Sequence, residues 1–299
     1  MAGKICRRLL ALIGLLGCLT LGFFAYPSAA HAASPVWAIR GEHNTVYLAG
    51  SVHLLKAQDS KLPAAFDRAY ASAKGLVMEL DMDSLDPSAA AGWMLENGMN
   101  ADGEGLETIA GPARYQQIAT EAKRLGMPKE LLDQFAPWVV GMELIELQYA
   151  QLGYDANSGV EMQLDQRAKA DGKPIRGLET LEEQLGFLGN MSMPDQLKFL
   201  DMTIAELHDT NGDTQSVVTA WRTGDAGKLA ALLSDEYKSF PALYRMLVSE
   251  RNRRWVPQIE KLLKEPQDAF VVVGALHLVG DGGLLELLRR DGFKAEQLN

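Results

Sequence analysis

The stretch Val46-Tyr-Leu-Ala-Gly-Ser-Val-His53 decides the fold, because residues 270–277, which read Phe-Val-Val-Val-Gly-Ala-Leu-His, repeat its design. In each stretch, four residues that mostly favour β-structure lead into a Gly-x-x-His motif, and a leucine follows. A short apolar run that ends at glycine predicts a buried strand that breaks into a turn. Glycine at this point allows either a positive φ or a close approach of two backbones.

The repeat also predicts where His53 and His277 lie. Each histidine comes just after a strand, which is where open α/β sheets carry their ligands. One Gly-x-x-His motif would indicate little, because a single histidine is more often a structural residue. Residues 33–299 contain only four histidines, however, and two of them hold equivalent places in motifs that are 224 residues apart. We therefore expect one site built from both ends of the chain.

The N-terminal residues have the pattern of a secretory signal peptide. Three basic residues precede an apolar run from Leu9 to Phe24, and Ala30-His31-Ala32 offers a small-x-small cleavage site. We predict a signal peptide over residues 1–32 that is cleaved after Ala32, and a mature protein in the periplasm or secreted. The apolar run is short for a membrane span, although an uncleaved anchor is the alternative. After cleavage no stable membrane insertion is expected.

Composition narrows the class of protein. Both cysteines, Cys6 and Cys18, leave with the predicted signal peptide, so the mature chain has neither a disulfide nor a thiol nucleophile. Without residues 1–32 the chain has 26 basic and 39 acidic residues, an acidic balance that disfavours nucleic acid and anionic membranes as partners. Residues 33–299 suit one large domain with an ample core.

Strand patterns occur near both ends of the chain and helical patterns lie between them. The expected strands cover residues 36–40, 45–50, 75–81, 175–179, 268–274 and 293–298. Helices are expected at residues 61–73 and 284–290 and through a long insert of about residues 86–265, with polar loops at 152–159 and 210–214. The sequence thus predicts a single α/β domain whose central mixed β-sheet combines both chain ends, with the insert helices packed around it. The two motif strands should be parallel, since the insert can supply the crossover that parallel strands need.

Two histidines need carboxylates to complete a cation site, because mixed His and carboxylate sets suit Mn, Fe, Co or Zn. Neither His-Glu-x-x-His nor Cys-x-x-Cys is present. Glu161 is the first candidate, since it follows a glycine loop at the start of a predicted helix; alternatively it only favours the helix dipole. Glu79 is the second candidate, at the carboxyl end of the strand predicted over 75–81; alternatively it is a solvated strand end.

The pair of motifs ending at His53 and His277 resembles the TraB/GumN family, which includes the TIKI metalloproteases. Further motifs that carry the resemblance lie between the pair: Met78-Glu79-Leu80, Gly159-Val160-Glu161, Lys173-Pro174, Gly177-Leu178-Glu179-Thr180, Glu183-Gln184 and Glu250-Arg251-Asn252. The resemblance covers nearly all of residues 33–299 in order.

The resemblance implies a divalent-metal-dependent protease that needs its two Gly-x-x-His motifs and one glutamate. Carried over to this sequence, the metal ligands are His53, His277 and Glu161, with Mn, Co, Zn or Fe as the cofactor. Either Glu161 or Glu79 would take a proton from water, and which of them is the ligand stays open. Arg251 can hold a substrate carboxylate or a developing oxyanion; alternatively it forms an ion pair that braces its helix.

Three functions follow as hypotheses. The first is metal-dependent hydrolysis of a peptide or another amide in the periplasm. The second is non-catalytic binding of metal, haem or peptide on the same scaffold. The third is ester hydrolysis, as in the erythromycin-esterase-like enzymes that also use paired histidines. In each case the expected partner is a peptide or a small molecule. The remaining histidines, His43 and His208, are expected at the surface.

Overall fold

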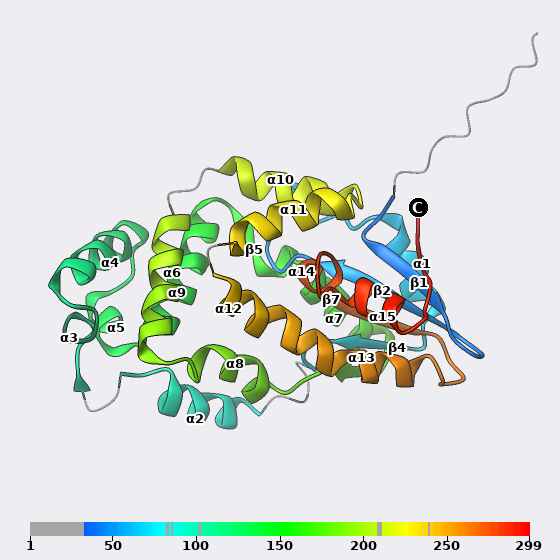
Figure 1. Ribbon diagram of the computed structural model, residues 1–299, viewed down its shortest axis with the longest axis horizontal. Helices are drawn as coiled ribbons and strands as arrows, with labels where there is room; N and C mark the ends of the chain where they lie inside the picture. Colours follow the sequence, from blue (N-terminus) through cyan, green and yellow to red (C-terminus); the bar gives the residue numbers. More distant parts are fainter. Residues whose placement is uncertain (1–32, 82–83, 85, 101–102, 208–210, 239) are drawn as a thin grey trace, which may run out of the picture. The chain divides into compact units, whose positions relative to one another are not determined.

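The computed structural model describes residues 33–81, 84, 86–100, 103–207, 211–238 and 240–299 (Figure 1). The described residues from 33 to 299 form one compact unit. The predicted signal peptide and its cleavage site lie outside the described residues, as does His208. Within the described ranges, no helix is long and apolar enough to cross a membrane.

A six-stranded mixed sheet lies at the centre, with the strand order β6-β4-β7-β2-β1-β8. Its members are β1 (Val36–Arg40), β2 (Thr45–Ser51), β4 (Gly75–Met78), β6 (Ile175–Gly177), β7 (Ala269–Gly274) and β8 (Ala295–Gln297). The four strands β2, β7, β4 and β6 are parallel to their neighbours in that group, and β1 is antiparallel to both β2 and β8. The predicted fold class, α/β with a mixed sheet from both chain ends, is confirmed.

The two motif strands lie side by side and parallel, as predicted. Gly50 of β2 is opposite Val273 of β7, and Ser51 is opposite Gly274. On its other side β7 pairs in parallel with β4, which ends one residue before Glu79. Because parallel strands end at the same edge of a sheet, this register brings both Gly-x-x-His motifs and Glu79 to one edge.

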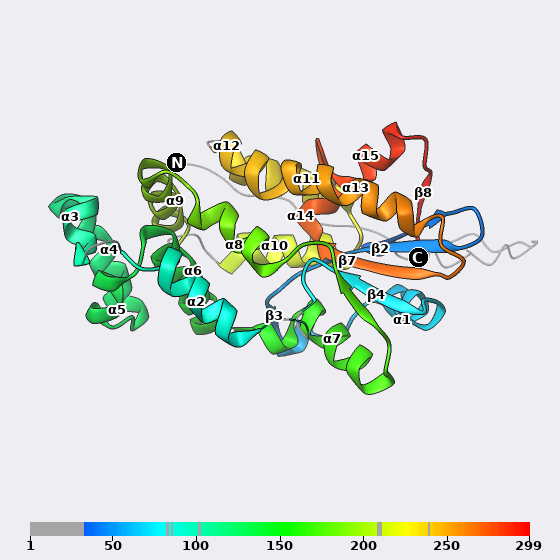
Figure 2. The same ribbon diagram turned by 90° about the horizontal axis from the view of Figure 1, so that it is seen from below.

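The centre of the sheet is held between helices on both faces. Figure 2 shows α13 (Glu250–Leu262) on one side of the sheet, with α1 (Ala64–Ser72) and α7 (Val160–Asp171) on the other. Residues 270–273 of β7 are fully buried, and Phe66 of α1 packs edge-on against Phe270 with 6.1 Å between ring centroids. Trp221, fully buried in α10 (Asn211–Arg222), donates from Nε1 to the Gly50 carbonyl at 2.7 Å. This hydrogen bond fixes β2, the strand that carries the first motif, close to its carboxyl end and three residues before His53.

Only part of the helical insert packs against the sheet. The prediction that all helices of residues 86–265 surround the sheet is therefore corrected. Five of its helices enclose a separate apolar core: α3 (Leu106–Ala110), α4 (Pro112–Leu125), α5 (Lys129–Gln134), α6 (Pro137–Gln151) and α9 (Met193–Glu206). Figures 1 and 2 both show α3, α4 and α5 at the end of the molecule away from the sheet. Apolar residues at helical spacing indicate a buried face, but they do not identify what covers that face.

Two predicted loops also contain regular structure. In residues 152–159, β5 (Tyr154–Asp155) pairs antiparallel with β3 (Leu55–Lys56), which begins two residues after His53. Of the loop predicted over 210–214, Thr210 lies outside the described residues, and residues 211–214 already belong to α10. The remaining elements are η1 (Ala57–Asp59), α2 (Pro87–Asn97), η3 (Ala156–Ser158), α8 (Leu181–Gly189), α11 (Ala226–Tyr237), α12 (Pro241–Tyr244), η4 (Arg245–Ser249), α14 (Ala275–Leu278) and α15 (Leu284–Arg290).

Candidate active site

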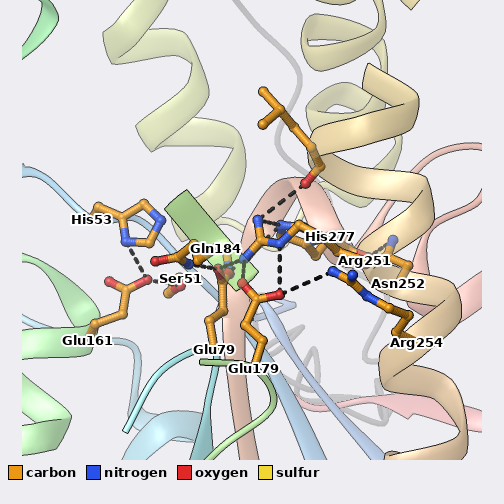
Figure 3. A network of polar contacts seen from close by, with 12 residues as sticks. Ser51, His53, Glu79, Glu161, Glu179, Gln184, Arg251, Asn252, Arg254 and His277 are labelled. Carbon is orange, nitrogen blue, oxygen red and sulfur yellow. Dashed lines mark hydrogen bonds and ion pairs between the residues drawn. The ribbon is translucent and has the colours of Figure 1, made fainter. Parts of the chain in front are cut away.

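His53 and Glu161 face each other at the edge of the sheet (Figure 3). His53 lies in the loop after β2, and Glu161 is the second residue of α7. His53 Nδ1 is 2.9 Å from Glu161 Oε1, and the Ser51 hydroxyl donates to the same oxygen. The second carboxylate oxygen, Oε2, is buried and has no hydrogen-bond partner. A buried carboxylate oxygen without a donor is costly, so this atom needs a partner, water or a ligand, that the neighbouring side chains do not supply.

A close backbone approach brings Glu161 to His53. The Val160 N–H donates to the Val52 carbonyl at 3.1 Å, so the start of α7 is joined to the first motif. At Gly159 a Cβ would lie 2.0 Å from the His53 carbonyl oxygen, a distance that no side chain allows. Glycine at 159 is therefore needed for the contact.

His277 lies in the short helix α14, where it is buried and its two ring nitrogens are held from opposite sides. Nε2 is 3.0 Å from Arg251 Nη1, and Nδ1 is 2.8 Å from Asn252 Oδ1. A guanidinium can only donate, so Nε2 is the acceptor and Nδ1 carries the proton. The Asn252 amide is oriented by its Nδ2, which donates to the backbone carbonyls of His277 at 3.1 Å and Gly282 at 2.9 Å. The imidazole is thus a neutral Nδ1–H tautomer whose lone pair points to Arg251.

Arg251 joins this histidine to two buried carboxylates. Nη2 donates to Glu79 Oε2 and Glu179 Oε1, Nε donates to Glu179 Oε2 at 3.2 Å, and Nη1 also donates to the Leu247 carbonyl at 3.2 Å. The side chain is 8% exposed. Its N–H groups are all turned to protein acceptors, so in this arrangement Arg251 braces the site, and holding a substrate would require it to release a partner.

The two halves of the site meet over Gly274. A Cβ placed on Gly274 would lie 3.3 Å from Glu79 Oε1, 3.6 Å from His277 Cδ2 and 3.7 Å from His53 Nε2. The same glycine donates its N–H to Glu79 Oε1 at 2.7 Å. Its φ is −48°, so the glycine serves a close approach and not a left-handed turn. The structure therefore places His53, His277, Glu79 and, through His53, Glu161 around one point.

The donor types suit a divalent cation, although the ligand set is not assembled. Among the described residues, no three His, Cys, Asp or Glu side chains already form a group that could hold a metal. Glu161 Oε2 lacks a partner and His53 Nε2 faces Gly274, so this half of the site can accept a cation. In the other half, His277 Nε2 and both oxygens of Glu79 are engaged by Arg251, Gly274 and Gln184.

Burial and charge set the protonation of the inner half. Burial lowers the pKa of His277 to about 4, although the Glu79 carboxylate opposes the shift. Burial also works to raise the pKa of Glu79, but positive charge at His277, Arg251 and His53 and the Gly274 N–H lower it. Since His277 is neutral near pH 7, the Arg251 guanidinium and the His53 imidazolium supply that charge. Glu79 is therefore a carboxylate beside a neutral imidazole.

In the outer half the carboxylate of Glu161 raises the pKa of His53. The His53 side chain is 67% exposed, so water screens this attraction. The two motif histidines thus share a sequence pattern but differ in environment: His53 is exposed and its pKa is raised, whereas His277 is buried and its pKa is lowered.

The lowered pKa of His277 predicts a pH dependence of stability. Between about pH 6.5 and pH 4 the unfolded chain binds a proton at this residue and the folded chain does not, so the free energy of unfolding should decrease as pH falls through that window. His277→Gln should flatten this decrease, as measured by urea unfolding in the presence of a chelator. His43→Gln, in the exposed turn between β1 and β2, is the control and should keep the wild-type slope. Equal slopes in all three proteins would contradict the neutral, buried state of His277.

Three further site residues carry no catalytic signal in the sequence by themselves. Glu179 binds Arg251, Gln184 Nε2 donates to Glu79 Oε2 at 3.1 Å, and Ser51 donates to Glu161. A Thr-x-x-Glu capping box at Thr180 and Glu183 starts α8 and sets the position of Gln184. That spacing is visible in the sequence, but the target of Gln184 is not.

Comparisons with known proteins identify the family of the chain. The sequence model of the TraB/PrgY/gumN family matches residues 35–297, and the chain belongs to this family. It is 28% identical over 271 residues to the uncharacterized protein YbaP of Escherichia coli (strain K12), a match that covers 85% of this chain and 97% of YbaP. YbaP of Shigella flexneri matches with the same identity and coverage. No solved structure matches the chain.

Proposed function

We propose that the protein is a divalent-metal-dependent hydrolase that cleaves peptide or other amide bonds after export to the periplasm or the cell exterior. The observation that carries the proposal is the buried, unpartnered Oε2 of Glu161, which lies beside His53 where two Gly-x-x-His motifs meet. Peptide as the substrate class follows from the resemblance to TIKI-type proteases.

The proposed ligands are His53, His277 and Glu161, with Mn, Co, Zn or Fe as the cation. Such a cation, when bound, lowers the pKa of a water molecule and polarises a scissile carbonyl. Imidazole nitrogens and a carboxylate oxygen are ligands that each of these metals accepts.

The carboxylates of the site have different parts in this proposal. Both oxygens of Glu79 accept hydrogen bonds, from Gly274, Gln184 and Arg251, and its pKa is lowered, so it is a weak proton acceptor. Its charge instead fixes Arg251 beside His277. Glu161 has an oxygen free of donors, which makes it the better group either to hold the cation or to take a proton from water.

A second candidate function is metal binding without turnover. The observation that favours it is the contact of Arg251 with His277, which leaves only the His53–Glu161 half open. An esterase with the same ligands would differ only in its substrate.

The test is hydrolysis by the exported chain after removal of metal with a chelator. We expect cleavage of a peptide library, followed by mass spectrometry, to stop on chelation and to return when Zn²⁺, Mn²⁺, Co²⁺ or Fe²⁺ is added back. His53→Ala should not recover. Tight metal binding without cleavage of peptides or esters would identify a binder, and cleavage of esters alone would identify an esterase. Peptide cleavage that persists after complete chelation would contradict the proposal.

A further inference from the structure

We propose that Arg251 competes with the divalent cation for the same acceptor, His277 Nε2, and thereby sets the metal affinity of the site. This inference rests on the proposed function, since it takes His277 as a ligand. It adds a determinant of affinity that neither the motifs nor the resemblance assigns.

The contact at His277 Nε2 carries the argument. A neutral imidazole has one lone pair, and here Arg251 Nη1 donates to it at 3.0 Å. Asn252 fixes the proton on the opposite nitrogen, so the ring has no second lone pair to offer. Nε2 can therefore serve the guanidinium or a cation, but not both at once.

Arg251 can release His277 and still be held by its other contacts. Its Nε and Nη2 hold Glu179 at both oxygens, which is a two-point contact independent of His277. The guanidinium also lies 4.7 Å from the centre of the Trp255 ring and 5.8 Å from that of Phe187. Release of His277 would leave these contacts intact. A divalent charge near the site would also repel the guanidinium.

Arg254 provides a matched control on the same helix. Its Nη2 lies 3.7 Å from Glu179 Oε2, but its side chain is 47% exposed. Removing either arginine removes one positive charge next to Glu179. Only Arg251 donates to His277 Nε2. Loss of a positive charge should therefore raise the metal affinity of both arginine variants, whereas loss of competition should raise it only when Arg251 is replaced.

The test is titration calorimetry of chelator-treated protein with Zn²⁺ and with Mn²⁺. Arg251→Gln should bind at least one of these ions about tenfold or more tightly than the wild type, the effect of one charge-assisted hydrogen bond. Arg254→Gln should change the affinity by no more than about twofold, as a half-exposed charge contributes little. Affinity in Arg251→Gln that equals or falls below that of the wild type, or a gain that Arg254→Gln matches, would overturn the inference.

A second variant covers the case in which Arg251→Gln does not fold. Arg251→Lys keeps the charge but lacks the planar fork, and one ammonium cannot hold Glu79, Glu179 and His277 together. We expect tighter metal binding and a larger metal-induced rise in melting temperature than in the wild type; an unchanged affinity would contradict competition. If the wild type binds metal and neither Arg251 variant binds it more tightly, this inference is wrong and the proposed function is unaffected. If the wild type and all variants bind no metal, the proposed function fails with it.

Discussion

Replacing Glu161 with glutamine is expected to lower peptide hydrolysis by about 10²- to 10⁴-fold, the range that general acid–base groups supply. The substitution is nearly isosteric and removes only the charge. Its Oε1 contacts, to Ser51 and His53, can still form through the amide oxygen, so the start of α7 should stay in place. The measurement is kcat/KM on the best peptide from the library, together with the metal content of the purified protein.

The metal content separates the two roles of Glu161. Lost activity with metal retained would make Glu161 the group that takes the proton, whereas lost metal would make it a ligand. Glu182→Gln is the control, because Glu182 is an exposed acid in the first turn of α8 and has the same relation to its helix dipole. If Glu161 only favours its helix, both variants should retain near wild-type activity, and that outcome would remove Glu161 from the site.

The two motif strands, β2 and β7, follow from the sequence because each is a short, mostly apolar run that leads into glycine. Strand β7 is buried along its whole length, and this is why residues 269–274 have no polar side chain. The repeated motif also predicts that β2 and β7 are parallel, since both histidines must leave the same edge. The strand predicted over 75–81 ends early, at Met78, and the carbonyl of the next residue, Glu79, accepts N–H groups from both Leu178 and Glu179.

The site is only partly predictable, because a motif does not show which other parts of the chain will pack against it. His53 meets the start of α7 and stays exposed, whereas His277 is covered by α13 and becomes buried. Two identical patterns therefore give one accessible imidazole and one neutral, enclosed imidazole. Asn252 shows the same limit: the sequence places it in the Glu250-Arg251-Asn252 motif, but only the fold shows that its fully buried side chain holds the ring and backbone of His277.

The role of Gly159 is likewise a property of the fold. In the sequence it is a loop glycine before a helix, with an N-cap position that many residues could fill. In the structure the bare Cα lets the His53 carbonyl approach, and this approach brings Glu161 to the histidine. A glycine whose φ is −64° has no conformational reason to be glycine, so only the neighbouring strand end explains it.

The second large effect is expected in metal binding itself. If His53 and His277 are ligands of one cation, His53→Ala and His277→Ala should each weaken binding by about 100-fold or more, beyond the effect of losing a supporting contact. Far-ultraviolet circular dichroism of the metal-free variants should match the wild type for His53→Ala, since that side chain is exposed. His277→Ala removes a buried side chain and should also lower stability.

The measurement that tests the shared site most directly is therefore a titration of chelator-treated wild type, His53→Ala and His277→Ala with Zn²⁺ and Mn²⁺, read by calorimetry. The shared site predicts one tightly bound ion per wild-type chain and the loss of that same binding event in both variants. Binding in either folded variant with wild-type affinity and stoichiometry would contradict a site shared by the two motifs.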